Sequence, residues 1–221
     1  MQPFSLDGSD LGHLSRIYAQ CGNYAAASAL ANELISLTDE KGASFWKAAG
    51  MIFQGGLLAL TGKAADGVET ITSGITAYRC TGATVGMPST LSILARAYGE
   101  LCQFDDSWRC IDEAMTIIGA SGETWSEAEV NRIAGEIALK SPERDASKAE
   151  AYFERALSVA RQQQAKSWEL RASISLARLW RDQGKVQQAR ELLAPVYGWF
   201  TEGFDTFDLK KAKALLEELA A

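Results

Sequence analysis

A repeat of about 40 residues constrains this chain more than any other feature of its sequence. Gly22, Gly62 and Cys102 follow one another in steps of 40 residues, and the same local pattern returns at Gly184. Seven residues before each of them stands a small residue, and a large residue follows that small one three positions later. A period of this length indicates a repeat architecture in which each unit buries its apolar face against the next.

Five such units fit into the chain. Their small residues are Ser15, Gly55, Ala95, Ala134 and Ala177. A second small residue follows in each unit, at Ala27, Gly67, Ser107, Ala149 and Ala189. A core residue then follows at Ala31, Ile71, Ile111, Phe153 and Leu193. Small residues let two antiparallel helices approach closely while large ones fill the groove beside them, so each unit is predicted to be a helical hairpin.

Three tryptophans recur at the same distance from the small residues and support this division into units independently. Trp46, Trp125 and Trp168 each lie nine residues before the small residue of their own unit. We interpret them as packing between neighbouring hairpins rather than as a stack for a bound ligand, because large aromatic side chains commonly fill such interfaces.

The predicted fold is an all-α superhelix that occupies residues 1–221 as one domain. The expected hairpins span residues 8–40, 43–81, 88–119, 124–164 and 167–200, and a C-terminal helix follows at 206–220. The S/T-x-x-E spacing of Thr124 with Glu127, and of Ser147 with Glu150, predicts capping boxes at two helix starts. Pro195 falls inside the tenth expected helix, where we expect a kink.

The small-x-x-large pattern resembles the tetratricopeptide repeat. Residues 94–98 (LARAY) and 149–153 (AEAYF) carry the likeness, although the period is about 40 instead of 34 residues. The resemblance implies a right-handed superhelix of about five hairpins. It also implies a concave face, lined by the first helix of each hairpin, that binds a protein or a peptide.

A second likeness lies in the C-terminal part of the chain. It is carried by residues 124–129, 132–137, 149–161, 165–180 and 197–206. These segments resemble the C-terminal tail of large bacterial signal-transduction proteins that join an adenylate or guanylate cyclase domain, or a DNA-binding domain, to an ATPase module. The resemblance implies a non-catalytic regulatory or scaffold region whose chemistry resides in other domains.

The charge balance excludes several classes of partner. With 22 basic and 28 acidic residues the net charge is −6, which opposes binding to nucleic acid and to anionic membranes. No apolar run is long enough to span a membrane, and residues 1–10 lack the basic start and apolar core of a signal peptide. We therefore expect a cytoplasmic protein.

Catalytic, cofactor and metal motifs are missing from the sequence. The segment 56–64 resembles a phosphate-binding loop, but it has five residues between its glycines instead of four and ends in alanine. His13 is the only histidine, and the four cysteines form no CxxC pair, so we expect neither a metal site nor a nucleophile with a histidine base. The sequence predicts no enzyme and no cofactor.

One pattern suggests a binding surface on the concave face. In the tetratricopeptide fold the residue after each small position points into the groove, and here these residues are Arg16, Gly56, Arg96, Gly135 and Arg178. Arg171 and Arg181 lie about two and one helical turns from Arg178 and are expected to share its face. Such arginines could hold a protein, an acidic peptide or an anionic small molecule through bidentate hydrogen bonds.

The alternative is that these arginines only neutralise neighbouring acids such as Glu100 and Asp182. The sequence thus favours an interaction or scaffold module that binds a partner in its groove. A second hypothesis is a small-molecule sensor that regulates an attached ATPase, cyclase or transcription-factor domain, and self-association through the unsealed ends of the array remains open.

Overall fold

The computed structural model describes residues 7–220, and this part of the chain contains eleven α-helices and no strand. The helices are α1 (Gly8–Gln20), α2 (Tyr24–Lys41), α3 (Ser44–Leu60), α4 (Ala64–Cys80), α5 (Met87–Glu100), α6 (Phe104–Ser121), α7 (Glu127–Lys140), α8 (Ala146–Gln162), α9 (Lys166–Asp182), α10 (Val186–Gly198) and α11 (Phe207–Glu218). They confirm the predicted order of five hairpins and a C-terminal helix. The expectation about residues 1–10 rests partly on residues outside the described range. None of the described helices is long and apolar enough to cross a membrane.

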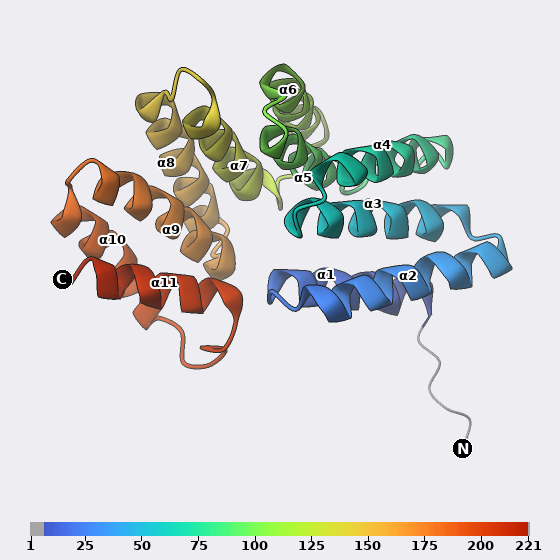
Figure 1. Ribbon diagram of the computed structural model, residues 1–221, viewed down its shortest axis with the longest axis horizontal. Helices are drawn as coiled ribbons and strands as arrows, with labels where there is room; N and C mark the ends of the chain where they lie inside the picture. The colour runs from blue at the N-terminus through green and yellow to red at the C-terminus, as the bar shows by residue number, and fades with distance from the viewer. Residues whose placement is uncertain (1–6, 221) are drawn as a thin grey trace.

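The odd-numbered helices form the inner layer of a curved array (Figure 1). Each of them packs against the next odd-numbered helix, whereas the even-numbered helices pack mainly on their sequence neighbours. The odd-numbered helices, including α11, therefore line the concave side. This arrangement is the helical repeat superhelix that the sequence predicts.

The small residues lie where the two helices of a hairpin cross. The hydroxyl of Ser15 donates a hydrogen bond to the carbonyl of Ala27 at 2.9 Å, and Ser107 bonds to the carbonyl of Ala95 in the same way at 2.6 Å. Both bonds join buried groups at equivalent positions of the first and third hairpins. Small side chains thus permit close approach and satisfy backbone groups at the crossing.

The predicted core positions of the outer helices are confirmed. Ala31, Ile71, Ile111, Phe153 and Leu193 are at most 1% exposed. They take the same place in each hairpin, so the core is a series of similar layers rather than one central cluster.

In the fourth hairpin, the inner-helix residue that meets the outer helix comes one position later in the sequence than predicted. Gly135, not Ala134, meets the outer helix, because a Cβ atom on Gly135 would lie 2.4 Å from the ring of Phe153. In the second hairpin, a Cβ atom on Gly55 would likewise lie 2.7 Å from the side chain of Ile71. The predicted placement of Gly135 in the groove is therefore wrong.

The capping boxes predicted at Thr124 and Ser147 do not form. Helix α7 begins only at Glu127, after Ser126, whose side chain makes no capping hydrogen bond. Helix α8 is capped slightly earlier than expected by Asp145, whose carboxylate accepts a backbone N–H of the first turn at 2.9 Å. An aspartate at this position satisfies an orphan donor as well as a serine does, so it takes over the role.

The two ends of the array touch each other. The backbone N–H of Phe207, the first residue of α11, donates to the carbonyl of Cys21 at 3.3 Å, and the rings of Phe207 and Tyr24 meet edge to face with centroids 6.3 Å apart. Gly22 adopts a left-handed φ of +84°, and a Cβ atom there would lie 2.7 Å from Phe207. The array closes into a ring because the carboxyl end of α1 meets the amino end of α11.

Phe207→Ala is expected to weaken this contact by about 1 kcal/mol, the typical contribution of an aromatic pair. The radius of gyration from small-angle scattering should increase, because the first hairpin swings away from α11. Phe204→Ala is the matched control, since Phe204 is an exposed aromatic residue that packs on Tyr197. Equal scattering curves for Phe207→Ala and the control would contradict closure.

Candidate functional site

Four inner helices bring charged side chains together on the concave side. The cations are Arg96 of α5, Arg132 of α7, Arg171 and Arg178 of α9, and Lys211 of α11. The carboxylates are Glu129 and Glu136 of α7 and Asp208 of α11. We call these eight residues the groove cluster. Five cations against three carboxylates give it a charge of +2, in a protein whose net charge is −6.

Arg132 is the buried centre of the groove cluster. Its guanidinium donates two hydrogen bonds of 2.7 Å to the carboxylate of Glu129, a third bond to Glu136, and a fourth of 3.4 Å to the hydroxyl of Ser175. Burial alone would raise the pKa of Glu129, but the charge and hydrogen bonds of Arg132 lower it to about 2. The donors of Arg132 are thus engaged within the protein, which marks it as a structural ion pair.

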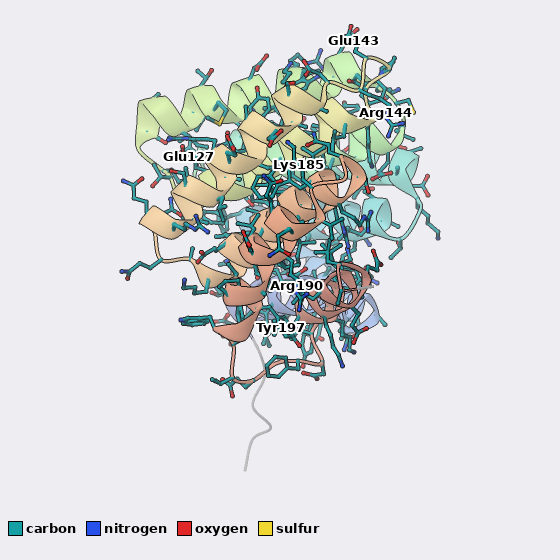
Figure 2. All side chains as sticks on the ribbon, turned by 90° about the vertical axis from the view of Figure 1, so that its left-hand side faces the viewer. Glu127, Glu143, Arg144, Lys185, Arg190 and Tyr197 are labelled. Carbon is teal, nitrogen blue, oxygen red and sulfur yellow. The ribbon has the colours of Figure 1, made fainter. Side chains whose placement is uncertain are left out.

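The free energy of unfolding is expected to fall between about pH 4.5 and pH 2. The pKa of Glu129 lies lower in the folded protein than its ordinary value of 4.5, so its ionisation stabilises the fold above pH 4.5 and this contribution is lost toward pH 2. Glu129→Gln should remove on the order of 3 kcal/mol of this pH dependence. Urea unfolding at several pH values measures it, with Glu143→Gln in the exposed α7–α8 turn as control (Figure 2). The same slope in both variants would contradict this role.

Arg171 and Arg181 fasten α11 to α9. Arg171 pairs with Asp208 at 2.5 Å, and Arg181 pairs with Glu218 at 2.5 Å. Arg171 also donates a 3.4 Å hydrogen bond to the carbonyl of Gln20, so it contributes to the closure of the array. Both arginines, which the sequence suggested as partner contacts, already have acidic partners within the chain.

Arg16 lies apart from the groove cluster, on the side chain of a tryptophan. Its guanidinium carbon is 5.5 Å from the ring centroid of Trp125, which precedes α7 and is 38% exposed. Trp46 packs against Gly12 of α1, and Trp168 packs where α7 meets α8, as predicted for contacts between hairpins. Trp125 instead connects the first hairpin to the start of the fourth.

Of the predicted arginines, Arg16, Arg96 and Arg178 make no ion pair with any residue in the described range 7–220, and of these three Arg96 and Arg178 belong to the groove cluster. Both are half-buried. The acids that could have neutralised them are engaged elsewhere, since Glu100 pairs with Lys140 at 2.5 Å and Asp182 pairs with Arg181 at 2.9 Å. Burial lowers the pKa of Arg96, and the nearby charges of Glu129 and Glu136, which already pair with Arg132, offset this only in part. These two side chains have donors left for a ligand.

A cavity of about 560 Å³ gives access to Arg96. It lies beside the turn between α3 and α4, and its lining includes Lys63, Asp66 and Glu100. The first turn of α4 also borders it, and the amino end of this helix carries no side-chain cap. Two cationic and two acidic side chains line this cavity, and the backbone N–H groups at the helix start add a partial positive charge that favours an anionic group beside Arg96.

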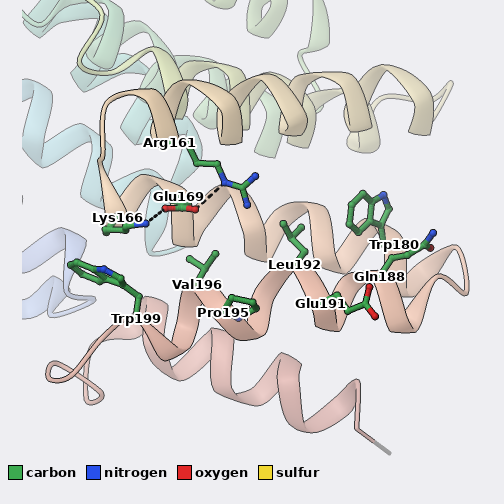
Figure 3. A pocket seen from close by; sticks show the side chains of 10 residues that line it. All are labelled: Arg161, Lys166, Glu169, Trp180, Gln188, Glu191, Leu192, Pro195, Val196 and Trp199. Atoms are coloured by element: carbon green, nitrogen blue, oxygen red, sulfur yellow. Dashed lines mark hydrogen bonds and ion pairs between the residues drawn. The ribbon is translucent and has the colours of Figure 1, made fainter.

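A second cavity lies on the outer side, between α9 and α10 (Figure 3). It measures about 500 Å³, with Leu192, Pro195 and Val196 in its lining and Trp199, 58% exposed, beside it. Both cations around it are paired, because buried Glu169 binds Arg161 at 3.0 Å and Lys166 at 2.6 Å, and Glu191 accepts a hydrogen bond from Gln187. Of these two cavities, the one beside the α3–α4 turn reaches an unpaired arginine of the groove cluster, so we take the concave groove as the candidate site.

The sequence missed most of the groove cluster. The spacing of Glu129, Arg132 and Glu136, three and four residues apart, could have indicated an ion-paired helix face. Asp208 and Lys211 had no such signal, because their position depends on how the last helix packs on the curved array.

The fold is shared with solved structures. A kinesin-light-chain-like protein of Podosopora anserina, described as having nearly identical tetratricopeptide-like repeats, is 16% identical with a TM-score of 0.56 over 95% of each chain. A substituted form of that protein is 18% identical with a TM-score of 0.57, over 86% of this chain and 92% of that one. The sequence matches no protein-family model and no curated protein. At these identities the likeness establishes the fold alone, which is that of a tetratricopeptide-like repeat superhelix.

Proposed function

We propose that this protein is a non-catalytic interaction module that binds an acidic segment of a partner protein in its concave groove. One observation carries the proposal: Arg96 and Arg178 are half-buried and make no ion pair with residues 7–220, while the neighbouring Arg132 and Arg171 have acidic partners. Holding arginines partly out of water without a directly paired carboxylate costs free energy, and a carboxylate or phosphate of a ligand would recover it.

The likeness of residues 124–206 to the tails of bacterial signal-transduction proteins supports a regulatory setting. A helical array whose units contact only their neighbours can change its curvature when a ligand binds. Binding in the groove would then alter the position of an attached domain, because the ligand favours one curvature of the array over others.

Quantitative affinity capture from extracts of the source cells tests the interaction. The full chain is compared with the double variant Arg96→Ala/Arg178→Ala and with Arg144→Ala/Arg190→Ala, which removes the same number of arginines; Arg144 is exposed in the α7–α8 turn. Arg190 lies on the outer helix α10 and is exposed (Figure 2). We expect one protein to be recovered by the wild type and the control and lost in the groove variant. Equal recovery by both variants, with circular dichroism spectra unchanged, would refute the proposal.

A small-molecule sensor is the second candidate, and the closure of the array favours it. The contact of Phe207 with Cys21 and Tyr24 joins the two ends, so a small anion enters the groove more easily than a folded partner does. A ligand that binds only the folded state raises the melting temperature. A rise with anionic metabolites, absent in Arg96→Ala/Arg178→Ala, combined with no captured protein would favour the sensor.

A further inference from the structure

Arg178 and Lys211 are neighbours on two helices whose alignment is set by ion pairs. The pairs Arg171–Asp208 and Arg181–Glu218 both join residues 37 positions apart, so α9 and α11 run parallel in constant register. This register places Lys211 opposite residue 174, one helical turn before Arg178. Two cations from adjacent helices therefore lie on the same stretch of the groove.

Neither of these two cations has an acidic partner among the described residues. Lys211 is half-buried, with its ammonium nitrogen 3.9 Å from the ring centroid of Phe207. Burial and the charge of Arg178 lower the pKa of Lys211. The acids that face it, Asp208 and Glu136, are engaged by Arg171 and Arg132.

We propose that Arg178 and Lys211 form a binding site for a phosphate group that carries two negative charges. The inference rests on the proposed function and names the chemistry of the ligand. The charge of +2 in the groove cluster matches a phosphate monoester near pH 7, whereas one carboxylate would neutralise only half of it. A guanidinium and an ammonium on separate helices also suit a tetrahedral group, whose oxygens accept hydrogen bonds from several directions.

The test measures the binding of inorganic phosphate to the full chain in two ways, by calorimetry and by the rise in melting temperature. We compare the wild type with Arg178→Gln, Lys211→Gln and the control Lys213→Gln, an exposed lysine of the same helix. Phosphate should bind to the wild type and the control, and at least tenfold more weakly to the other two variants. Equal binding to all four proteins, or the same melting shift with sodium chloride at matched ionic strength, would overturn the inference.

The pH dependence provides a second measurement. Because the second pKa of phosphate is near 6, phosphate should bind several-fold more weakly at pH 5 than at pH 7, whereas sulfate keeps two charges and should bind equally at both. Equal pH dependence for the two anions would count against recognition of the doubly charged group.

The source of the phosphate is distinguished by two further probes. Tight binding of a phosphoserine peptide assigns the site to a phosphorylated partner, and tighter binding of free phosphoserine assigns it to a small phosphate ester. Absence of phosphate binding, with partner capture still dependent on Arg96 and Arg178, would refute this inference and leave the proposed function standing. Loss of both would refute both.

Discussion

Gly135→Ala is expected to destabilise the protein by about 2 kcal/mol, although alanine is the best helix former and normally gains about 1 kcal/mol over glycine inside a helix. Gly135 lies inside α7, and its added methyl group would come within 2.4 Å of the buried ring of Phe153. Phe153 is 1% exposed and is enclosed by other core side chains. The helices α7 and α8 would have to separate, at the cost of core contacts along the hairpin.

Gly119→Ala is the matched control for this prediction. Gly119 lies inside α6, and a Cβ atom there would meet nothing within 4 Å. The control should therefore stabilise the protein by up to about 1 kcal/mol. Urea unfolding measures both, and Phe153→Leu should partly rescue Gly135→Ala by providing space. A stabilising Gly135→Ala would contradict the close approach of α7 and α8.

Reversing the charges of the unpaired arginines is expected to have the largest effect on binding. A hydrogen bond to a charged group contributes about 1.5–3 kcal/mol, so Arg96→Glu/Arg178→Glu should weaken the binding of an acidic partner at least about a hundredfold. No ion pair within residues 7–220 is lost, but a carboxylate at position 96 would lie near Glu129 and Glu136, so urea unfolding of each variant checks that the fold persists under the binding conditions.

The control for charge reversal is Arg144→Glu/Arg190→Glu, which makes the same change in net charge at exposed positions away from the groove cluster. Binding is measured by calorimetry with the partner recovered by capture, at two salt concentrations. The control should stay within a fewfold of wild type. An equal loss in both variants would mean that net charge, and not the groove, determines the affinity.

Much of the fold could be predicted because small residues and glycines mark every hairpin. The alignment of Cys102 with Gly22 and Gly62 agrees with the structure, in which Cys102 adopts a left-handed φ of 58° at the same turn position. This conformation is unusual for a residue with a Cβ atom, and its place in the repeat accounts for it. Local sequence suffices here because each hairpin repeats the same packing.

The fourth hairpin and the groove could be predicted only in part. The longer α7–α8 turn allowed two phases that differ by one residue, and only the contact of Gly135 with Phe153 decides between them. Which arginines are paired depends on contacts between residues such as Arg171 and Asp208, which lie 37 positions apart. Such contacts follow from the curvature of the whole array, and no local pattern encodes them.

The most direct test of the central claim is nuclear magnetic resonance of the arginine side chains during titration with the partner recovered by capture. The Nε–H signals of Arg96 and Arg178 report on the groove, those of Arg181 and Arg190 serve as internal controls, and the indole signal of Trp199 reports on the outer cavity. The account predicts that the Arg96 and Arg178 signals shift with the titration while the other three stay in place. Shifts at Trp199 or Arg190 with Arg96 and Arg178 unchanged would contradict it.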